Sequence, residues 1–152
     1  MSGLAAGLSV ASGRRWAVSR GLRNNNPGNI RRSRVRYKGE VHPSRDPDFK
    51  EFSSMAYGYR AMFVLLDTYR SRYGLSTIRQ MLNRYAPPEE NFTEGYVRFV
   101  ADYSGVMPDE SVDTRADMDM IPIVAAMSKI ENGVAANLAD VEEGWRLFVS
   151  LK

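Results

Sequence analysis

The sequence predicts a mainly α (α+β) domain with about five helices and a small β-hairpin lobe near its N-terminus. From residue 54 onward, apolar residues recur at spacings of three and four, and most of these stretches end at Gly or Pro. Residues 24–52 show little helical periodicity and are interrupted by Gly39, Pro43 and Pro47. The 152 residues, of which 43% are hydrophobic and 26% charged, suit one domain with its own core.

The N-terminal residues 1–20 are rich in Gly, Ser and Ala and then become basic. We expect them to form an arm that precedes a folded domain at 21–152. The apolar stretch at 4–11 is short and follows no basic residue, so it does not predict a signal peptide. No run reaches the ~20 apolar residues that a membrane-spanning helix needs, so no membrane span is expected.

The segment before the first long helix predicts the β lobe. Residues 34–38 alternate polar and apolar side chains, as a half-buried strand does. The Gly and Pro residues that follow supply turns. We therefore expect a hairpin built on this strand.

A long helix is expected over about residues 54–73, where one apolar stripe has helical spacing and Gly74 supplies the stop. Ser76 or Thr77 can cap a short second helix, which must end before the Pro87-Pro88 pair. The short helix carries Ile78, Met81, Leu82 and Tyr85.

A third helix follows the Pro-rich turn. Asn91 and Glu94 have the three-residue spacing of a capping box, ahead of apolar residues between Tyr96 and Tyr103. Gly105 predicts the end of this helix.

Two more helices complete the domain. One is expected from about 119 to 132, with Pro122 in its first turn and Gly133 directly after it. Asp140 and Glu143 predict the start of a last helix, which bears apolar residues as far as residue 149.

The composition argues against metal or cofactor chemistry. Cysteine is absent and His42 is the single histidine, so neither a thiolate site nor a His-based zinc site is expected. We predict no metal and no cofactor.

The net charge of +3 is modest, but the positive charges crowd toward the front of the chain. This crowding favours a polyanionic partner such as a phosphate-bearing cell-surface polymer, or it marks only a solvated basic face. Nucleic acid is unlikely, because the cluster shows neither interleaved aromatic residues nor a helix-turn-helix pattern. The basic residues are Arg14, Arg15, Arg20, Arg23, Arg31, Arg32, Arg34, Arg36 and Lys38.

Residues 23–31, Arg-Asn-Asn-Asn-Pro-Gly-Asn-Ile-Arg, predict a stiff polar loop. Asn tolerates left-handed backbone angles, Pro fixes φ and Gly permits a reversal, so the side-chain amides are held in place. Fixed amides suit the recognition of a sugar or a peptide. The alternative is that each Asn only bonds its own turn.

Glu131 lies in the last turn predicted for the fourth helix. The negative end of the helix dipole, together with any apolar shielding, raises the pKa of a carboxyl group there. A glutamate that stays protonated can be the general acid of glycosidic cleavage. The alternative is an exposed helix-end Glu without a function.

Five motifs taken together resemble a bacteriophage-encoded, virion-associated family that is similar to the lysozyme and lytic transglycosylase superfamily. The resemblance covers roughly residues 21–133 and implies a lysozyme-like fold. The motifs are residues 23–31, Asp-Pro-Asp-Phe-Lys-Glu-Phe at 46–52, Tyr-Gly-Tyr-Arg-Ala at 57–61, Tyr-Ala-Pro-Pro-Glu-Glu-Asn-Phe-Thr at 85–93, and Tyr-Val at 96–97.

In the goose-type lysozymes and lytic transglycosylases that this chain resembles, the helix with the catalytic Glu comes before the Asn-rich loop. Here the loop at 24–30 comes first and Glu-Asn-Gly at 131–133 comes later. This order resembles a circular permutation, which folds tolerate because chain ends lie at the surface. The permutation requires the loop and Glu131 to lie close together.

The resemblance implies that Glu131 is the catalytic acid and base of a muramidase acting on peptidoglycan glycan strands. One Glu is enough for a lytic transglycosylase, whereas an inverting hydrolase needs a second carboxylate roughly 6.5–9.5 Å away. Asp46 is the candidate for that second group, with Glu40 as the alternative; if the permutation is wrong, either could be the acid. The candidate substrate-binding residues are Asn25, Asn26, Asn29, Tyr57, Tyr85 and Tyr96.

A catalytically inactive virion structural or adaptor protein with a lysozyme-like fold is the alternative to an enzyme. In either case we expect a phage virion protein, or a protein made in the host cytoplasm and delivered to the periplasm and cell wall. The basic part of the arm could then contact other virion proteins.

Overall fold

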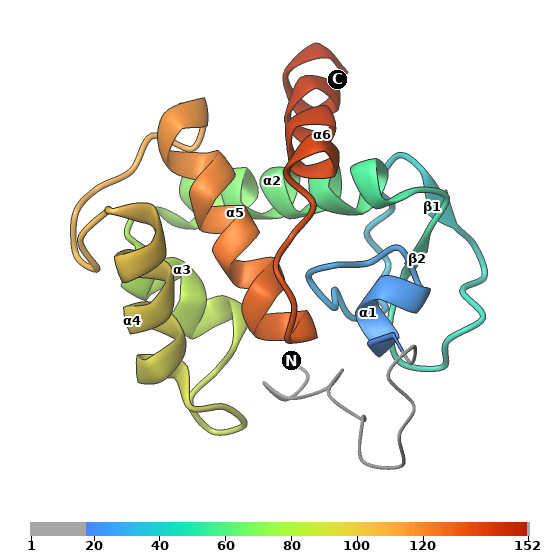
Figure 1. Ribbon diagram of the computed structural model, residues 1–152, viewed down its shortest axis with the longest axis horizontal. Coiled ribbons are helices and arrows are strands. Elements are labelled where there is room, and N and C mark those ends of the chain that lie inside the picture. The colour runs from blue at the N-terminus through green and yellow to red at the C-terminus, as the bar shows by residue number, and fades with distance from the viewer. Residues whose placement is uncertain (1–17, 152) are drawn as a thin grey trace.

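The computed structural model describes residues 18–151, and its elements confirm a mainly α (α+β) protein with a small two-stranded sheet (Figure 1). Residues 1–17 of the predicted arm lie outside the described residues. The elements in order are α1 (Arg20–Arg23), β1 (Glu40–Val41), β2 (Glu51–Phe52), α2 (Met55–Tyr73), α3 (Ile78–Tyr85), α4 (Thr93–Ser104), α5 (Asp117–Asn132) and α6 (Leu138–Ser150).

The folded body begins slightly before the predicted boundary at residue 21. Ser19 is buried, and its hydroxyl accepts a hydrogen bond from the backbone N–H of Leu22 at 3.1 Å, which makes it the N-cap of α1. Ser19 and Arg20 therefore belong to the fold.

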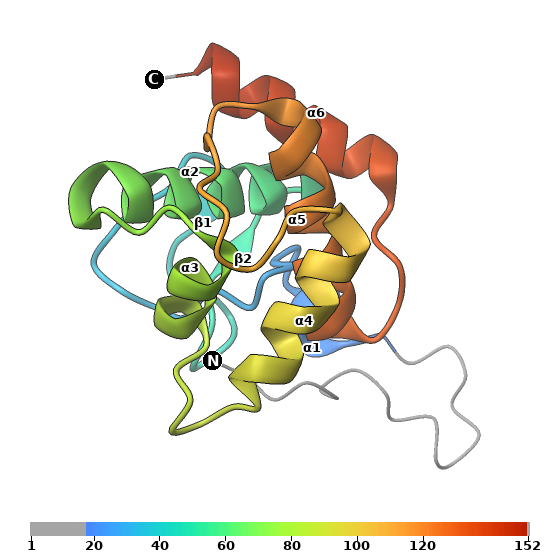
Figure 2. The same cartoon turned by 90° about the vertical axis from the view of Figure 1, so that its left-hand side faces the viewer.

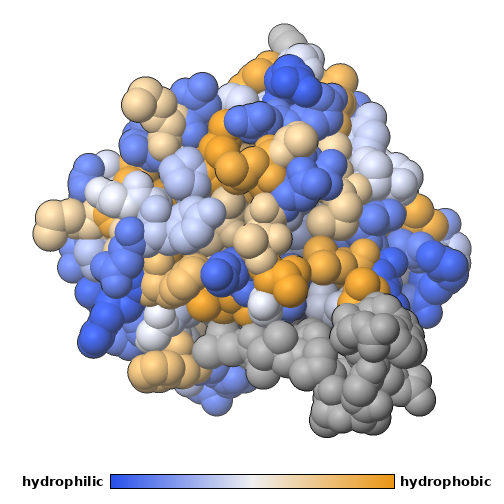
Figure 3. Space-filling model, in the orientation of Figure 1, coloured by the Kyte–Doolittle hydropathy of each residue, from blue (hydrophilic) through white to orange (hydrophobic). Residues whose placement is uncertain are grey.

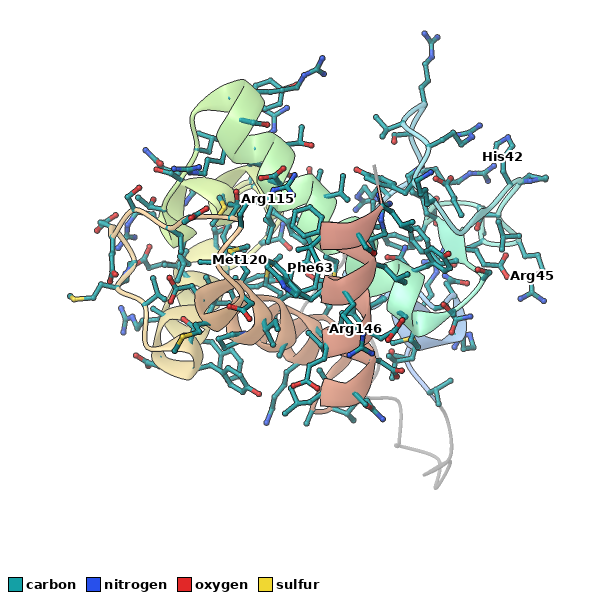
Figure 4. The ribbon with its side chains drawn as sticks, turned by 90° about the horizontal axis from the view of Figure 1, so that it is seen from above. His42, Arg45, Phe63, Arg115, Met120 and Arg146 are labelled. Atoms are coloured by element: carbon teal, nitrogen blue, oxygen red, sulfur yellow. The ribbon has the colours of Figure 1, made fainter. Side chains whose placement is uncertain are left out.

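Helix α2 crosses the molecule and packs against α6, while α4 packs against α5 (Figures 1 and 2). The ring of Phe63 on α2 meets Trp145 edge-on at 5.0 Å and Phe148 in a stacked arrangement at 5.9 Å. Gly144 permits this approach, since a Cβ there would lie 2.6 Å from the Cβ of Tyr59. Figure 4 shows Phe63 beside α6 and Met120 further along the same core.

The predicted limits of α2 and α3 are confirmed. Ser54 caps α2 by accepting from the N–H of Tyr57, and Gly74 ends it with φ 68°. Of the two candidates before α3, Thr77 is the cap, and it forms a capping box with Gln80. Local sequence signals suffice for these ends because each cap is made within four residues.

The capping box predicted for α4 is wrong. Helix α4 begins at Thr93 without a side-chain cap. The Asn91 amide donates instead to the carbonyl of Pro87 at 3.1 Å, and Glu94 forms an ion pair with Arg79. Tertiary partners have taken both side chains away from the helix end.

The starts of α5 and α6 also differ from the prediction. Helix α5 begins at Asp117, so Pro122 lies in its second turn rather than its first. Helix α6 begins at Leu138, where the Asn137 side chain is the cap and accepts from the N–H of Asp140. Helix α5 thus starts two residues before the predicted position, and the cap of α6 lies three residues before the predicted cap, Asp140.

The β lobe is present, but the predicted strand at 34–38 is not a strand. The antiparallel pairs are Glu40 with Phe52 and Val41 with Glu51. The Lys50 ammonium group explains the difference, because it takes the Val35 carbonyl at 2.7 Å and so removes an acceptor that a strand partner would need. Figure 4 shows His42 and Arg45 at the outer edge of this lobe.

On the face formed by α5 and α6, apolar and polar side chains are interspersed (Figure 3). Within residues 18–151, no helix is both long and apolar enough to pass through a membrane.

Candidate active site

The Asn-rich loop follows α1 directly and is held by its own side chains. Asn25 and Asn29 adopt left-handed conformations, with φ of 51° and 49°. The Asn26 amide donates to the carbonyls of Ile30 at 3.0 Å and Lys50 at 2.9 Å, and its oxygen accepts from the N–H of Ile30 at 2.9 Å. Asn25 donates to the carbonyl of Phe52 at 3.0 Å. These two amides therefore fasten the loop to the β lobe.

The loop also lies directly on α2 and α3. A Cβ on Gly58 of α2 would stand 2.1 Å from the carbonyl oxygen of Asn25. A Cβ on Gly28 would stand 2.3 Å from the hydroxyl of Tyr85, which donates to the Gly28 carbonyl at 2.5 Å. Two glycines are thus needed at the closest backbone approaches.

Glu131 meets this loop at the end of α5. The Asn29 amide donates to its Oε1 at 2.9 Å, and the Tyr96 hydroxyl on α4 donates to its Oε2 at 3.1 Å. The predicted closeness of the loop to Glu131 is therefore confirmed at Asn29. The side chain of Glu131 is buried, with 0% exposed.

Asn132, the last residue of α5, fixes the helix end to the loop. Its amide donates to the carbonyls of Pro27 at 2.8 Å and Ser128 at 2.9 Å, and its oxygen accepts from the Ser19 hydroxyl at 2.6 Å. Gly133 then ends the helix with φ 76°. These contacts set the position from which Glu131 projects.

The anchoring roles of Asn132 and Ser19 were not predicted from the sequence. Asn132 lies between Glu131 and the helix-ending Gly133, so the sequence indicates only that it belongs to the Glu-Asn-Gly helix end. A buried amide must find partners for its donors and acceptor, and the neighbouring Asn-rich loop supplies one of them. The partners of Asn132 can therefore be predicted only once the loop and the helix end are known to be adjacent.

Tyr85 and Tyr96 are buried, with 4% and 1% of their surfaces exposed. Burial raises the pKa of both phenols well above its usual value, and the nearby charge of Glu131 raises it further. Both stay protonated, so each presents a hydroxyl donor rather than an open ring face.

Tyr57 lies outside this contact network. Its half-buried ring packs against the β lobe, where a Cβ on Gly39 would stand 2.2 Å from the ring carbon Cγ. It lies in the first turn of α2, where Ser54 caps its N–H. Its contact thus joins α2 to the turn before β1.

Asp46 and Glu40 are both held by cations. Arg20 contacts Asp46 through two hydrogen bonds of 2.6 and 2.7 Å, and this guanidinium lowers the pKa of the carboxyl group strongly. The Glu40 carboxylate accepts from the buried Lys50 ammonium at 3.0 Å and from the Tyr37 N–H at 3.1 Å. Each carboxylate has a structural role in the β lobe.

The segment between α3 and α4 faces the Asn-rich loop. Arg31, which follows the loop, lies 3.9 Å from the carboxylate of Glu90. Both side chains are at least half exposed, so this pair forms an outer link between the two segments.

No cluster of three or more metal-ligating side chains occurs among residues 18–151.

The fold and site define a mainly helical protein in which one buried carboxyl group joins a polar loop to a helix end. No family model matches the chain. It is 39% identical over 119 residues to Protein P5 of Pseudoalteromonas phage PM2, an alignment that covers 76% of this chain and 72% of the relative. The chain belongs to the family of this phage protein.

Proposed function

We propose that the protein is a peptidoglycan-cleaving muramidase of the lytic transglycosylase type, with Glu131 as its acid and base. The observation that carries the proposal is the contact between Asn29 and Glu131, which joins two motifs that are 102 residues apart. Both motifs resemble parts of the lysozyme superfamily, in the reverse order. A lysozyme-like fold with a circular permutation accounts for that order.

The reaction needs one carboxyl group. Glu131 donates its proton to the oxygen that bridges N-acetylmuramic acid and N-acetylglucosamine, and the bond from that oxygen to the muramyl C1 breaks. The carboxylate then takes the proton of the muramyl 6-hydroxyl as O6 bonds to C1. The products are a free 4-hydroxyl and a 1,6-anhydro ring, and Glu131 regains its proton.

The neighbours of Glu131 suit this cycle. Asn29 and Tyr96 each donate to one carboxylate oxygen, so the group is held in one orientation. The high pKa of Tyr96 keeps its hydroxyl a donor throughout. The two other candidate carboxylates, Asp46 and Glu40, are bound to Arg20 and Lys50, which favours the mechanism with a single carboxylate.

Substrate access requires motion, because Glu131 is fully buried. The Asn-rich loop and the segment between α3 and α4 are the elements that would separate, and their outer link from Arg31 to Glu90 is weak. Closure around the glycan would exclude water, which favours ring closure over hydrolysis.

The second candidate is a catalytically inactive virion structural or adaptor protein with the same fold. Complete burial of Glu131 favours it, since a buried Glu with two donors also serves as a structural group. For either candidate we propose a place in the phage particle or at the host cell wall.

Cleavage of purified peptidoglycan tests the proposal. Mass spectrometry should find 1,6-anhydro-muropeptides with the wild type and none with Glu131→Gln, whereas Glu142→Gln, an exposed residue on α6, should behave as the wild type. Equal activity of Glu131→Gln and the wild type would exclude Glu131 as the acid. No product from any variant would leave the structural protein as the better candidate.

A further inference from the structure

A groove of 560 Å³ lies between residues 60–73 of α2, residues 35–38 and the end of α3. Five cationic residues line it, and its described lining includes neither Asp nor Glu. Such a concentration of one charge in a hollow attracts anions. The five residues are Arg36, Lys38, Arg60, Arg72 and Arg84.

Arg60 is the unusual member of this set. Only 6% of its surface is exposed, and its Nε has no hydrogen-bond partner within the described part of the chain. Burial lowers its pKa. A buried cation with an unused donor costs free energy unless an anion binds to it. We therefore expect a negatively charged group to bind in the groove beside Arg60.

Two tyrosines fix a second cation at the rim. The Arg84 guanidinium lies over the Tyr73 ring at 4.0 Å from its centroid and over the Tyr69 ring at 5.4 Å. This stacking holds the guanidinium group at the rim of the groove. Val64 and Leu65 add apolar surface to the same groove.

The groove adjoins the candidate active site through Tyr85. This residue follows Arg84 in the chain, and its hydroxyl donates to Gly28, the neighbour of Asn29. Burial raises the pKa of Tyr85, and the nearby groups Glu131, Tyr69 and Tyr37 raise it further; Tyr69 and Tyr37 line the groove. Tyr85 thus joins the end of α3, beside the groove, to the Asn-rich loop that contacts Glu131.

We propose that this groove binds the carboxylates of the peptide stems carried by peptidoglycan. The stems are attached to muramic acid, next to the bond to be cleaved, and they combine carboxylates with alanine methyl groups. Arg60, Arg72 and Arg84 match the carboxylates, and the aliphatic lining matches the methyl groups. The inference rests on the proposed function and narrows its substrate to glycan that carries peptides.

Binding by the full-length Glu131→Gln protein separates recognition from cleavage. The probes are a soluble N-acetylglucosaminyl-muramyl tetrapeptide and the same disaccharide without the peptide, titrated by calorimetry at low and at physiological salt. Arg72→Glu tests the groove, and Arg70→Glu is the matched control, since both are exposed on the last turns of α2 but Arg70 lies outside the groove lining.

We expect the tetrapeptide ligand to bind about tenfold more tightly than the peptide-free one, with the difference reduced by salt. Arg72→Glu should abolish the difference and Arg70→Glu should keep it. Equal affinity for the two ligands, no binding of either, or equal losses in both Arg variants would overturn the inference. Tighter binding of single-stranded DNA that Arg72→Glu abolishes would assign the groove to nucleic acid instead.

Failure of the proposed function would look different. If the Glu131→Gln protein shows the Arg72-dependent preference but the wild type releases no anhydro-muropeptides, the groove is a peptide-stem site on a protein that does not cleave. If the wild type cleaves peptide-free and peptide-bearing glycan equally, the proposed enzymatic function is supported and the proposed role of the groove is wrong.

Discussion

Asn29 and Glu131 are joined by a hydrogen bond of 2.9 Å, although 102 residues separate them in the chain. Both side chains are buried, with 1% and 0% exposed. The contact connects a loop near the start of the fold to the end of α5, so it depends on most of the tertiary structure. Its energy can be measured apart from any activity.

Removing the Asn29 side chain should destabilise the protein. Asn29→Ala loses a buried donor to a carboxylate and places Ala at φ 49°, for an expected loss of about 2–3 kcal/mol in the free energy of unfolding. Asn29→Gly loses the same bond but suits the backbone angle, so it should lose less. Urea unfolding monitored by Trp fluorescence measures both.

A double-mutant cycle of Asn29→Gly with Glu131→Ala isolates the pair itself, because Ala removes the acceptor that Gln would keep. The coupling free energy should be about 1 kcal/mol, as for a buried hydrogen bond. Additive effects of the two changes would contradict a direct interaction.

Much of the helical architecture could be predicted from the sequence, since apolar stripes and local caps act over short spans. The ends of α2 and α3 are set by Ser54, Gly74 and Thr77, which bond to residues within four positions. The predicted capping box of α4 is wrong because Asn91 and Glu94 have partners outside that helix. Sequence spacing does not show such competition.

The candidate site was predictable in part. The residues themselves predict the polar loop with Asn29 and the helix-end Glu131, and the circular permutation that we propose requires the two to lie close together. The anchoring by Asn132 and the ion pair of Asp46 with Arg20 depend on distant segments meeting, so no local pattern indicates them. The side chain of Asn26 bonds its own turn, which was the alternative to ligand binding, and it also donates to the carbonyl of Lys50.

The ion pair of Asp46 with Arg20 should make stability depend on pH. Because folding lowers the pKa of Asp46, its contribution is present above the unfolded pKa of about 4 and is lost as the pH falls below it. Asp46→Asn should cost on the order of 2 kcal/mol at pH 7, and the cost should shrink toward pH 2.

Measuring thermal unfolding of the wild type and of Asp46→Asn between pH 2 and 7 tests this dependence. Asp102→Asn, an exposed residue on α4, is the control and should track the wild type at every pH. A constant cost of Asp46→Asn over the whole range would contradict the assigned ion pair.

Gly28→Ala should disrupt the loop beside Glu131. The new Cβ would stand 2.3 Å from the Tyr85 hydroxyl and 2.9 Å from Met62, so we expect a loss of about 1–3 kcal/mol from overpacking. Adding Tyr85→Phe removes the nearest of these atoms and should recover part of that loss.

Gly74→Ala provides the comparison for Gly28→Ala. No atom lies within 4 Å of its added Cβ, and only the φ of 68° opposes the change, so the cost should be about 1 kcal/mol. If Tyr85→Phe gives no recovery to Gly28→Ala, the steric explanation fails.

Breaking the buried pair of Lys50 and Glu40 should be costly, and removing both partners less so. Lys50 and Glu40 have side chains that are only 1% and 5% exposed, and their charged atoms lie 3.0 Å apart. Lys50→Met would leave the Glu40 carboxylate with only the half-exposed Arg36 guanidinium, at 3.9 Å. We expect a loss of about 3 kcal/mol or more for Lys50→Met. Lys50→Met combined with Glu40→Gln should be the more stable of the two proteins, because no buried charge is then unpaired.

Glu40→Gln also separates a structural carboxylate from a catalytic one. Since Glu40 is bound to Lys50 and to the Tyr37 N–H, this change should lower the unfolding midpoint in urea and leave the proposed cleavage of peptidoglycan by the folded protein unchanged. Loss of cleavage with an unchanged midpoint would indicate that Glu40 is the second carboxylate of an inverting hydrolase. Retained cleavage would support the mechanism in which Glu131 alone carries the proton.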